Sequence, residues 1–212
     1  MGLAISVGIL ADEMENDPEG ADWVREEIEQ INLVLSERKL PAHVEPESFP
    51  SLTTRGTMGG FPYSFLHYLR RFYAHVTADS SQLPTPLIEG QDPIDDDPYY
   101  KQVLETDCDS HLLCHSDAEG YYLPIDFDEV IVDDRVSGEM LGSSVRLMEE
   151  LVKIAPHLNI RLTDGYLSDE TAEFLSNEEE DSTPFWIERL VWFELYENAR
   201  LSIEHKTAIY FG

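Results

Sequence analysis

The sequence predicts one globular domain of the α+β (or α/β) class, in which four or five amphipathic helices pack on a small mixed β-sheet with a central hairpin. Several long segments carry apolar residues at helical spacing, and short apolar runs typical of strands lie near both ends and in the middle of the chain. The elements alternate irregularly, and no repeat or shift in composition divides the 212 residues. A single domain over residues 1–212 is therefore expected.

The first elements are a strand and a long helix. The apolar run Leu3–Leu10 is typical of a buried strand. Asp17 followed by Pro18 has the composition of a helix start, with a capping side chain and then proline in the first turn. Apolar residues at spacings of three and four continue this helix to about Arg38. Residues 43–57, rich in Pro, Ser and Thr, are expected to form a loop.

A second helix is predicted from Pro62 to about Ala78, and its broad aromatic face makes it the expected central helix. Residues 79–98 contain four prolines and several aspartates, which predicts an exposed acidic loop. A short helix is expected at Tyr99–Thr106.

The segment Ser110–Phe127 reads as two short strands joined by a polar turn that ends in Gly120, which would supply a positive φ. This is the predicted central hairpin. The rest of the chain is predicted to contain a helix after residues 142–144 that runs to about Ala155, a short helix capped by Ser168, a long helix from Pro184 to about Ile203, and a closing strand at Thr207–Gly212.

Charge is the most unusual property of the chain. It has 43 acidic and 14 basic side chains, for a formal net charge of −29. Such a surface repels phosphates and anionic lipids, so direct binding to nucleic acid or membrane is not expected, and a basic protein partner is. No apolar run approaches about 20 residues and no signal peptide is evident. A cytoplasmic location with reduced thiols is expected.

Two acidic segments are the predicted contacts for such a partner. The first lies in the Pro-rich loop and the second precedes the last helix. Their carboxylates are Asp92, Asp95, Asp96 and Asp97 in the first, and Glu178, Glu179, Glu180 and Asp181 in the second.

An alternative site is a pocket lined by basic and histidine side chains. His67, Arg71 and His75 recur every four residues, which places them along one side of the second helix. Arg70, His111 and His115 could complete a pocket for a carboxylate or other anion. Pairing with the protein's own carboxylates is the simpler role for this stripe.

A candidate metal site consists of Cys108, His111, Cys114 and His115, whose side chains are of the types that bind zinc. On a helix, three of them would share a face. On the predicted strand, the two histidines would stand about 13 Å apart, at about 3.3 Å per residue. No zinc-site spacing is matched, so neither a metal nor a cofactor is predicted.

Three segments carry a resemblance to a known family. They are Phe61–Arg71, Cys114–Phe127 and Glu204–Gly212. Here the chain resembles a family of uncharacterised bacterial cytoplasmic proteins from end to end, which implies a bacterial source and a single domain and transfers no catalytic residues. In size and acidity the chain is also similar to the immunity proteins of bacterial toxin systems.

Three functions remain open from the sequence. The first is an immunity-type inhibitor that binds a basic protein partner, and the second is an enzyme or small-ligand binder with a pocket near His67, Arg71, His111 and His115. The third is an acidic globular protein without a dedicated partner surface. No nucleotide-binding, metalloprotease or serine-hydrolase motif is present, which leaves an enzymatic role open but favours binding. No oligomeric state follows from the sequence.

Overall fold

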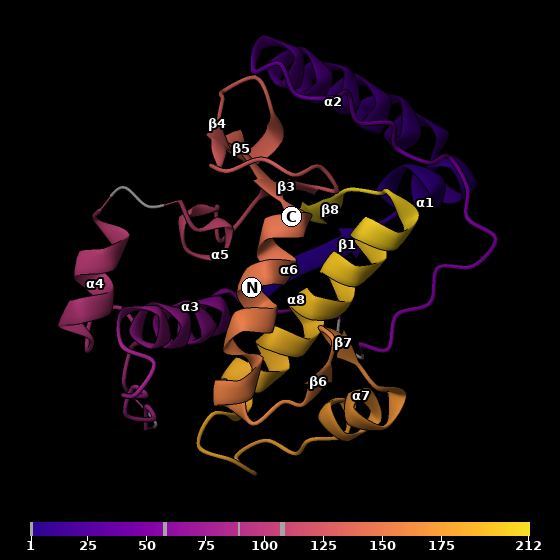
Figure 1. Ribbon diagram of the computed structural model, residues 1–212. Coiled ribbons are helices and arrows are strands. Elements are labelled where there is room, and N and C mark those ends of the chain that lie inside the picture. The colour runs from indigo at the N-terminus through magenta and orange to yellow at the C-terminus, as the bar shows by residue number, and fades with distance from the viewer. Residues whose placement is uncertain (1, 57–58, 89, 107–108) are drawn as a thin grey trace.

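The computed structural model describes residues 2–56, 59–88, 90–106 and 109–212 (Figure 1). Its α-helices are α1 (Ile9–Asn16), α2 (Pro18–Glu37), α3 (Tyr63–Ala78), α4 (Pro98–Leu104), α5 (His111–Cys114), α6 (Ser144–Ile154), α7 (Asp169–Ser176) and α8 (Trp186–His205). Its strands are β1 (Gly2–Val7), β2 (Gly60–Pro62), β3 (Gly120–Leu123), β4 (Ile131–Val132), β5 (Met140–Ser143), β6 (Leu162–Thr163), β7 (Tyr166–Leu167) and β8 (Ile209–Phe211). The predicted α+β class is confirmed, with more helices than expected in the described residues.

The main sheet has six strands in the order β2-β1-β8-β3-β5-β4. Its pairs are antiparallel except β3 and β5, which run parallel, with Tyr121 opposite Leu141. The C-terminal strand β8 lies in the middle, where it joins the N-terminal strand β1 to β3. The sheet is therefore mixed, as predicted, and it is held together by segments that are distant in the chain.

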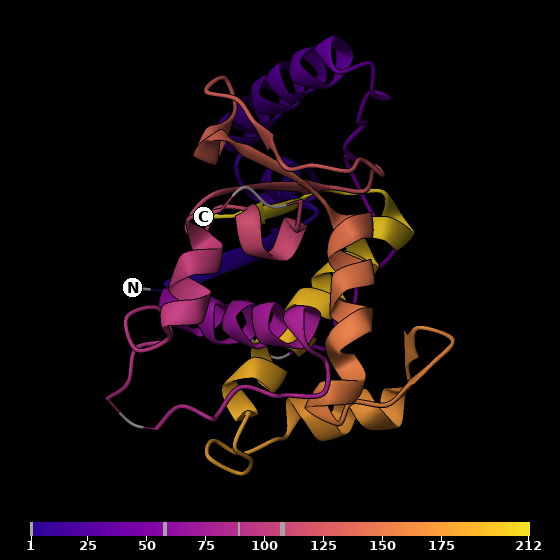
Figure 2. The same cartoon turned by 60° about the vertical axis from the view of Figure 1, so that its left-hand side comes forward.

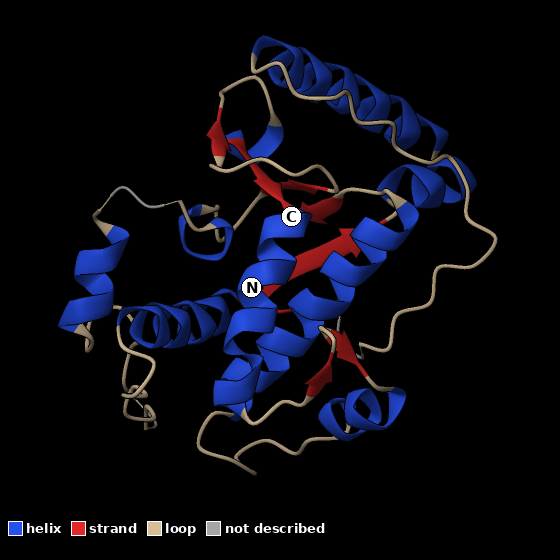
Figure 3. Cartoon of the chain, in the orientation of Figure 1, coloured by secondary structure: helices blue, strands red, loops and turns tan. Residues whose placement is uncertain are grey.

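Helices cover both faces of this sheet, because successive strand residues point to opposite sides. Tyr121 and Tyr210 pack in the core beneath α2, whereas Tyr122 and Phe211 belong to the larger core formed with α3, α6 and α8. Figures 2 and 3 show the strands between α2 on one side and α3, α6 and α8 on the other.

The larger core is centred on α8. Trp192 is fully buried, stacks on Tyr196 with ring centroids 4.8 Å apart, and donates its indole N–H to the Leu151 carbonyl of α6 at 2.8 Å. A buried indole requires such a partner. The expected central helix, α3, packs against α8 rather than forming the centre itself.

The helix α2 confirms its prediction almost residue for residue. The Asp17 carboxylate accepts a hydrogen bond from the Glu19 N–H at 3.1 Å, and Pro18 occupies the first turn. Trp23 is one of the apolar residues of this helix pattern, but it is 41% exposed and meets Tyr210 edge-on.

The predicted hairpin at Ser110–Phe127 is wrong. Its first half is the short helix α5, which Ser110 caps by accepting a hydrogen bond from the Leu113 N–H at 3.0 Å. Gly120 does have the positive φ that was expected, 134°, but it opens β3, whose partners are β5 and β8. A local pattern of alternating residues could not show that the partner strands lie elsewhere in the chain.

Other predicted elements are confirmed with shifted ends. Helices α3, α4, α6, α7 and α8 and strand β8 lie where the sequence predicts them. The apolar run after Val7 turns at Gly8 into α1 instead of extending the strand, and β2 was not anticipated. Within the described ranges, no helix combines the length and apolar character needed to cross a membrane.

Candidate acidic interface

The outer side of α2 carries a stripe of carboxylates. Buried Ala21, Val24, Ile28, Ile31 and Leu35 face the sheet. At about 100° per residue, the positions opposite this buried side are 19, 22, 26, 29, 33 and 37. All six are exposed, and they are Glu19, Asp22, Glu26, Glu29, Leu33 and Glu37.

We call the four carboxylates from Glu19 to Glu29 the α2 stripe. It extends over ten residues, or about 15 Å at 1.5 Å per residue, so neighbouring charges follow one another about every 5 Å along the axis. Arg25 pairs with Asp22 at 2.9 Å, while Glu19, Glu26 and Glu29 have no basic partner among the described residues. The stripe thus presents a regular, largely uncompensated row of negative charge.

The adjoining helix α1 adds further acids, and they border a cavity of about 950 Å³. We call this cavity the acid-rimmed groove. Asp12, Glu13 and Glu15 of α1 line it, together with Glu47 from the connection that follows α2. Its apolar lining comes from the end of β1, Phe49, Leu52 and Tyr210. The part of the chain that the structure describes contributes no lysine, arginine or histidine to this lining.

The far wall of the groove is the chain from 46 to 54, which passes along the outside of α1 and α8 (Figure 1). It is fastened at both ends. At one end the buried Glu45 carboxylate accepts hydrogen bonds from the Thr207 hydroxyl and, at 2.8 Å, from the Ala208 N–H. At the other end Arg55 pairs with Glu197 of α8 at 2.6 Å. The groove therefore has a wall anchored on two sides.

Two carboxylates of the predicted acidic loop at 92–97 form ion pairs within the protein. Asp97 is buried, caps α4, and binds Arg71 at 2.5 Å and His75 at 2.9 Å. Burial alone would raise the pKa of this carboxyl, but the Tyr100 N–H, Arg71 and His75 hold it below its ordinary value. Asp95 pairs with Lys101 at 3.1 Å.

Asp92 and Asp96 are exposed but also serve the loop. Asp92 accepts hydrogen bonds from the N–H groups of Ile94 and Asp95, and these hold its pKa below the ordinary value. Asp96 accepts one from the Asp92 N–H at 2.8 Å. The loop is therefore a folded turn with exposed carboxylates.

The second acidic segment, at 178–181, also contains one paired carboxylate and several exposed ones. Glu178 is half-buried and binds Arg189 of α8 at 2.7 Å. Glu179, Glu180 and Asp181 are exposed.

The alternative pocket residues are engaged within the fold. Arg70 donates to the carbonyls of Leu112 and His115, both at 2.7 Å. His67 bonds to the Tyr100 hydroxyl at 3.0 Å and the Asp117 carboxylate at 2.8 Å. Burial, with Arg70 nearby, keeps the pKa of His67 below its ordinary value. Arg71 and His75 both bind Asp97. They therefore pair with one of the protein's own carboxylates, which is the simpler role expected for this stripe.

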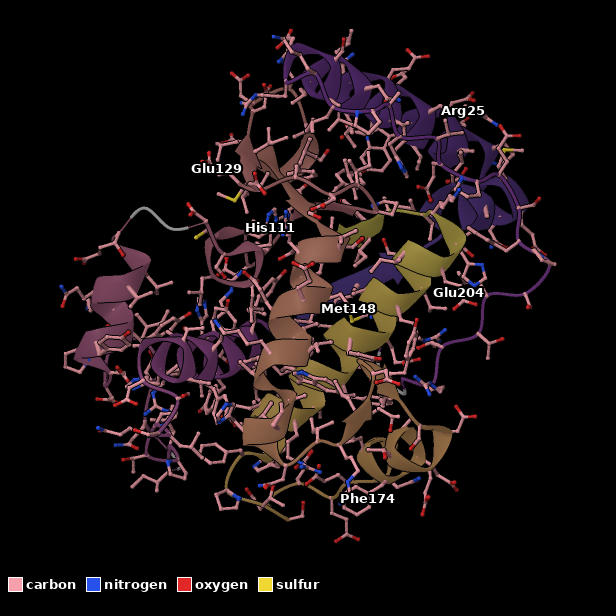
Figure 4. The ribbon with its side chains drawn as sticks, in the orientation of Figure 1. Arg25, His111, Glu129, Met148, Phe174 and Glu204 are labelled. Atoms are coloured by element: carbon pink, nitrogen blue, oxygen red, sulfur yellow. The ribbon has the colours of Figure 1, made fainter. Side chains whose placement is uncertain are left out.

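The two later histidines are also bonded to the main chain. His111 accepts from the Ser143 N–H at 2.9 Å through Nδ1 and bonds the Phe127 carbonyl through Nε2. The side chain of His111, labelled in Figure 4, comes from the short helix α5. His111 is among the residues that line a cavity of about 520 Å³. His115 stacks on Tyr122 with centroids 4.0 Å apart, and burial lowers its pKa to about 4.

The weak metal candidates can be placed only in part. Among the described residues, no three His, Cys, Asp or Glu side chains are grouped to hold a metal ion. Cys108 lies outside the described residues. Cys114 is disulfide-bonded, so the expectation of reduced thiols is wrong for it. The spacing argument also fails, because His111 lies in a helix and not in the predicted strand.

The acids of α1 and α2 are not among the partner contacts predicted from the sequence. Ten carboxylates and one arginine lie between residues 9 and 37. The heptad-like spacing of acids opposite the apolar positions was the signal that could have found the α2 stripe.

A comparison with protein families matches residues 1–211 to a family described as "Putative DNA-mimic protein". No curated protein and no solved structure matches the chain. The match overturns the predicted partner, which was a basic protein in an interaction without nucleic acid. A DNA mimic is directed to proteins that bind DNA, and these are defined by their DNA-binding surface and not by a basic net charge.

Proposed function

Because the chain belongs to this DNA-mimic family, we propose that it binds a DNA-binding protein and keeps that protein from DNA. The carrying observation is the family match over residues 1–211 in a chain of net charge −29. DNA-binding surfaces gain much of their affinity by contacting phosphates. A protein that offers carboxylates in a similar arrangement competes for the same contacts.

The α2 stripe supports this proposal by its spacing. One strand of B-DNA carries a charge about every 3.4 Å along the helix axis, and the stripe carries one about every 5 Å. The stripe lies on a rigid helix that is packed on the sheet. The backbone that carries these carboxylates is already ordered in the free protein, so binding need not order it, which favours affinity.

Inhibition of the immunity type, in which the DNA-binding partner is a bacterial toxin, is a special case of the proposal. The acidity and size of the chain favour it. A cytoplasmic location, as expected from the sequence, goes with the same proposal.

The test is competition with DNA. The chain is immobilised, exposed to lysate of the organism that encodes it, and eluted either with duplex DNA or with polyglutamate of equal total charge. We expect duplex DNA to release a specific protein and polyglutamate to release little of it. The captured protein is then purified and bound to labelled duplex DNA. We expect it to release this DNA as the chain is added, which fluorescence anisotropy measures.

Two variants with equal loss of charge locate the interface. The first converts the α2 stripe to amides, as Glu19→Gln, Asp22→Asn, Glu26→Gln and Glu29→Gln. The control changes four exposed acids of α7 and the following turn, as Glu170→Gln, Glu173→Gln, Glu179→Gln and Glu180→Gln.

We expect the stripe variant to compete about tenfold less well and the control to remain close to wild type. A stronger loss in the control would assign the interface to α7 and the turn that follows it. If the wild-type chain displaces no DNA from any captured protein, the proposed function is wrong.

A further inference from the structure

We propose that the acid-rimmed groove receives an arginine side chain on an arm or loop of the DNA-binding partner, as the minor groove of DNA does. The inference rests on the proposed function and adds to it a second contact site with its own ligand chemistry. Proteins that bind DNA insert arginine into the minor groove, where two phosphate walls concentrate negative potential.

The charge of the groove selects a cation. Asp12, Glu13 and Glu15 line the side of the groove formed by α1, and Glu47 lies on the wall formed by residues 46–54. Among the described residues, the lining contains no lysine, arginine or histidine. Arg25, at the edge, pairs with Glu47 at 3.2 Å and so compensates one of these charges from outside. Carboxylates on opposite walls of a cavity act together on a cation placed between them.

The apolar lining selects guanidinium over a small ion or an ammonium group. Phe49 and Tyr210 line the groove beside the carboxylates. Guanidinium is planar and weakly hydrated, so it stacks on aromatic rings while its N–H groups bind carboxylates. The volume of about 950 Å³ is far larger than a hydrated metal ion needs and accommodates a side chain with part of its backbone.

The wall of the groove is built to remain in place. Gly8, with φ 75°, lets the wall approach α1, because a Cβ there would lie 2.8 Å from the Phe49 ring. Phe49 in turn contacts His205 edge-on at 5.7 Å. The site is therefore formed before the partner arrives, which reduces the cost of ordering it.

The probe is a synthetic peptide with three arginines in a Gly–Ser background. Two matched peptides replace arginine with citrulline, which has the same shape without the charge, or with lysine. Binding to the full chain is followed by ¹H–¹⁵N NMR. We expect the arginine peptide to shift signals of residues 6–15 and 47–56, the lysine peptide to bind several-fold more weakly, and the citrulline peptide not to bind.

The blocking variant is Gly59→Phe. Gly59 lines the groove, and a Cβ at this position would meet nothing within 4 Å. We expect a ring at this lining position to fill part of the groove without displacing the backbone and to lower peptide affinity about fivefold. Ser48→Trp, at an exposed lining position, is the second blocking variant if Gly59→Phe alters the spectrum of the fold.

A pair of charge variants separates the groove from general attraction. Asp12→Asn with Glu15→Gln removes two groove charges, and Glu170→Gln with Glu173→Gln removes two from α7, at the opposite end of the molecule from α2, as the labelled Arg25 and Phe174 show in Figure 4. We expect only the first pair to weaken binding clearly.

Equal losses in the two pairs, equal binding of the arginine and lysine peptides, or full binding by both blocking variants would overturn the proposal. The peptide experiment does not use the partner. If the peptide does not bind in the groove, the competition experiment with DNA can still succeed. If the wild-type chain does not compete with DNA, the proposed function fails whatever the groove variants do.

Discussion

Arg55 and Glu197 fasten the groove wall to the buried side of α8. Arg55 Nη2 and Nε lie 2.6 and 3.1 Å from Glu197 Oε1, and the Arg55 backbone N–H donates to Oε2 at 3.1 Å. The Glu197 side chain has no exposed surface. Burial would raise the pKa of this carboxyl, but the bonds from Arg55 and Arg200 hold it below its ordinary value. The pair thus keeps a buried charge compensated while it positions the wall.

Replacing this arginine should destabilise the protein. Arg55→Met leaves Glu197 with Arg200 as its remaining partner, and we expect a loss of about 3 kcal/mol in the free energy of unfolding. The control is Arg25→Met, which breaks exposed pairs and should cost less than about 1 kcal/mol. Urea unfolding measures both. Equal losses would show that the Arg55 pair contributes no more than a surface contact.

The net charge of −29 should make stability depend on salt. Raising NaCl from about 0.01 M to about 1 M shortens the Debye length from about 30 to about 3 Å and screens repulsion among the acids. We expect the melting temperature to rise. The variant with an amide α2 stripe should show a smaller rise, because four of the repelling charges are gone. A melting temperature that is flat or falls with salt would contradict this.

Glu188 should give stability a dependence on pH. It is 2% exposed, and burial raises its pKa to about 7 from 4.5. Because the folded pKa is the higher one, the stabilisation is present below pH 4.5 and is lost as pH rises through 7. Glu188→Gln should remove this loss. The free energy of unfolding of the variant, relative to that of the wild type, should therefore be about 3 kcal/mol higher at pH 8 than at pH 4.5.

Urea unfolding of both proteins across this pH range gives the comparison. Glu150, whose pKa burial also raises to about 7, is present in both proteins, so the difference between them isolates Glu188. Glu170→Gln, exposed on α7, is the control and should follow the wild type. Parallel curves for wild type and Glu188→Gln would contradict the assignment.

Gly138 should be intolerant of a side chain. Its φ is 70°, and a Cβ would lie 2.3 Å from the Glu119 carbonyl. Gly165, with φ 83°, has open space around it. Gly165→Ala should cost about 1–2 kcal/mol for its backbone conformation alone, and Gly138→Ala more than about twice that. Similar losses, measured by urea unfolding, would mean that the backbone at 138 can move away from Glu119.

The helices could be predicted because their determinants are local. Asp17 and Pro18 start α2, and Ser168 caps α7 by accepting a hydrogen bond from the Thr171 N–H at 3.2 Å. These groups act within one turn of their own position. The same residues would direct the same helix starts in many folds.

The sheet could not be predicted in this way. The pattern at Ser110–Phe127 suggested a hairpin, but β3 pairs with β8, nearly ninety residues later, and with β5. Such partners are chosen by burial of Tyr121 and Tyr122 in two different cores, which only the assembled helices create.

For the candidate site, the total charge and the spacing of acids along α2 could be read from the residues alone. Which carboxylates remain available depends on how the helices and loops pack. Asp97 and Glu178, both predicted as contacts, turn toward Arg71 and Arg189. This happens because the neighbouring helices α3 and α8 bring an arginine against each of these carboxylates and neutralise it, whereas the α2 stripe faces water opposite its own core and meets few such partners.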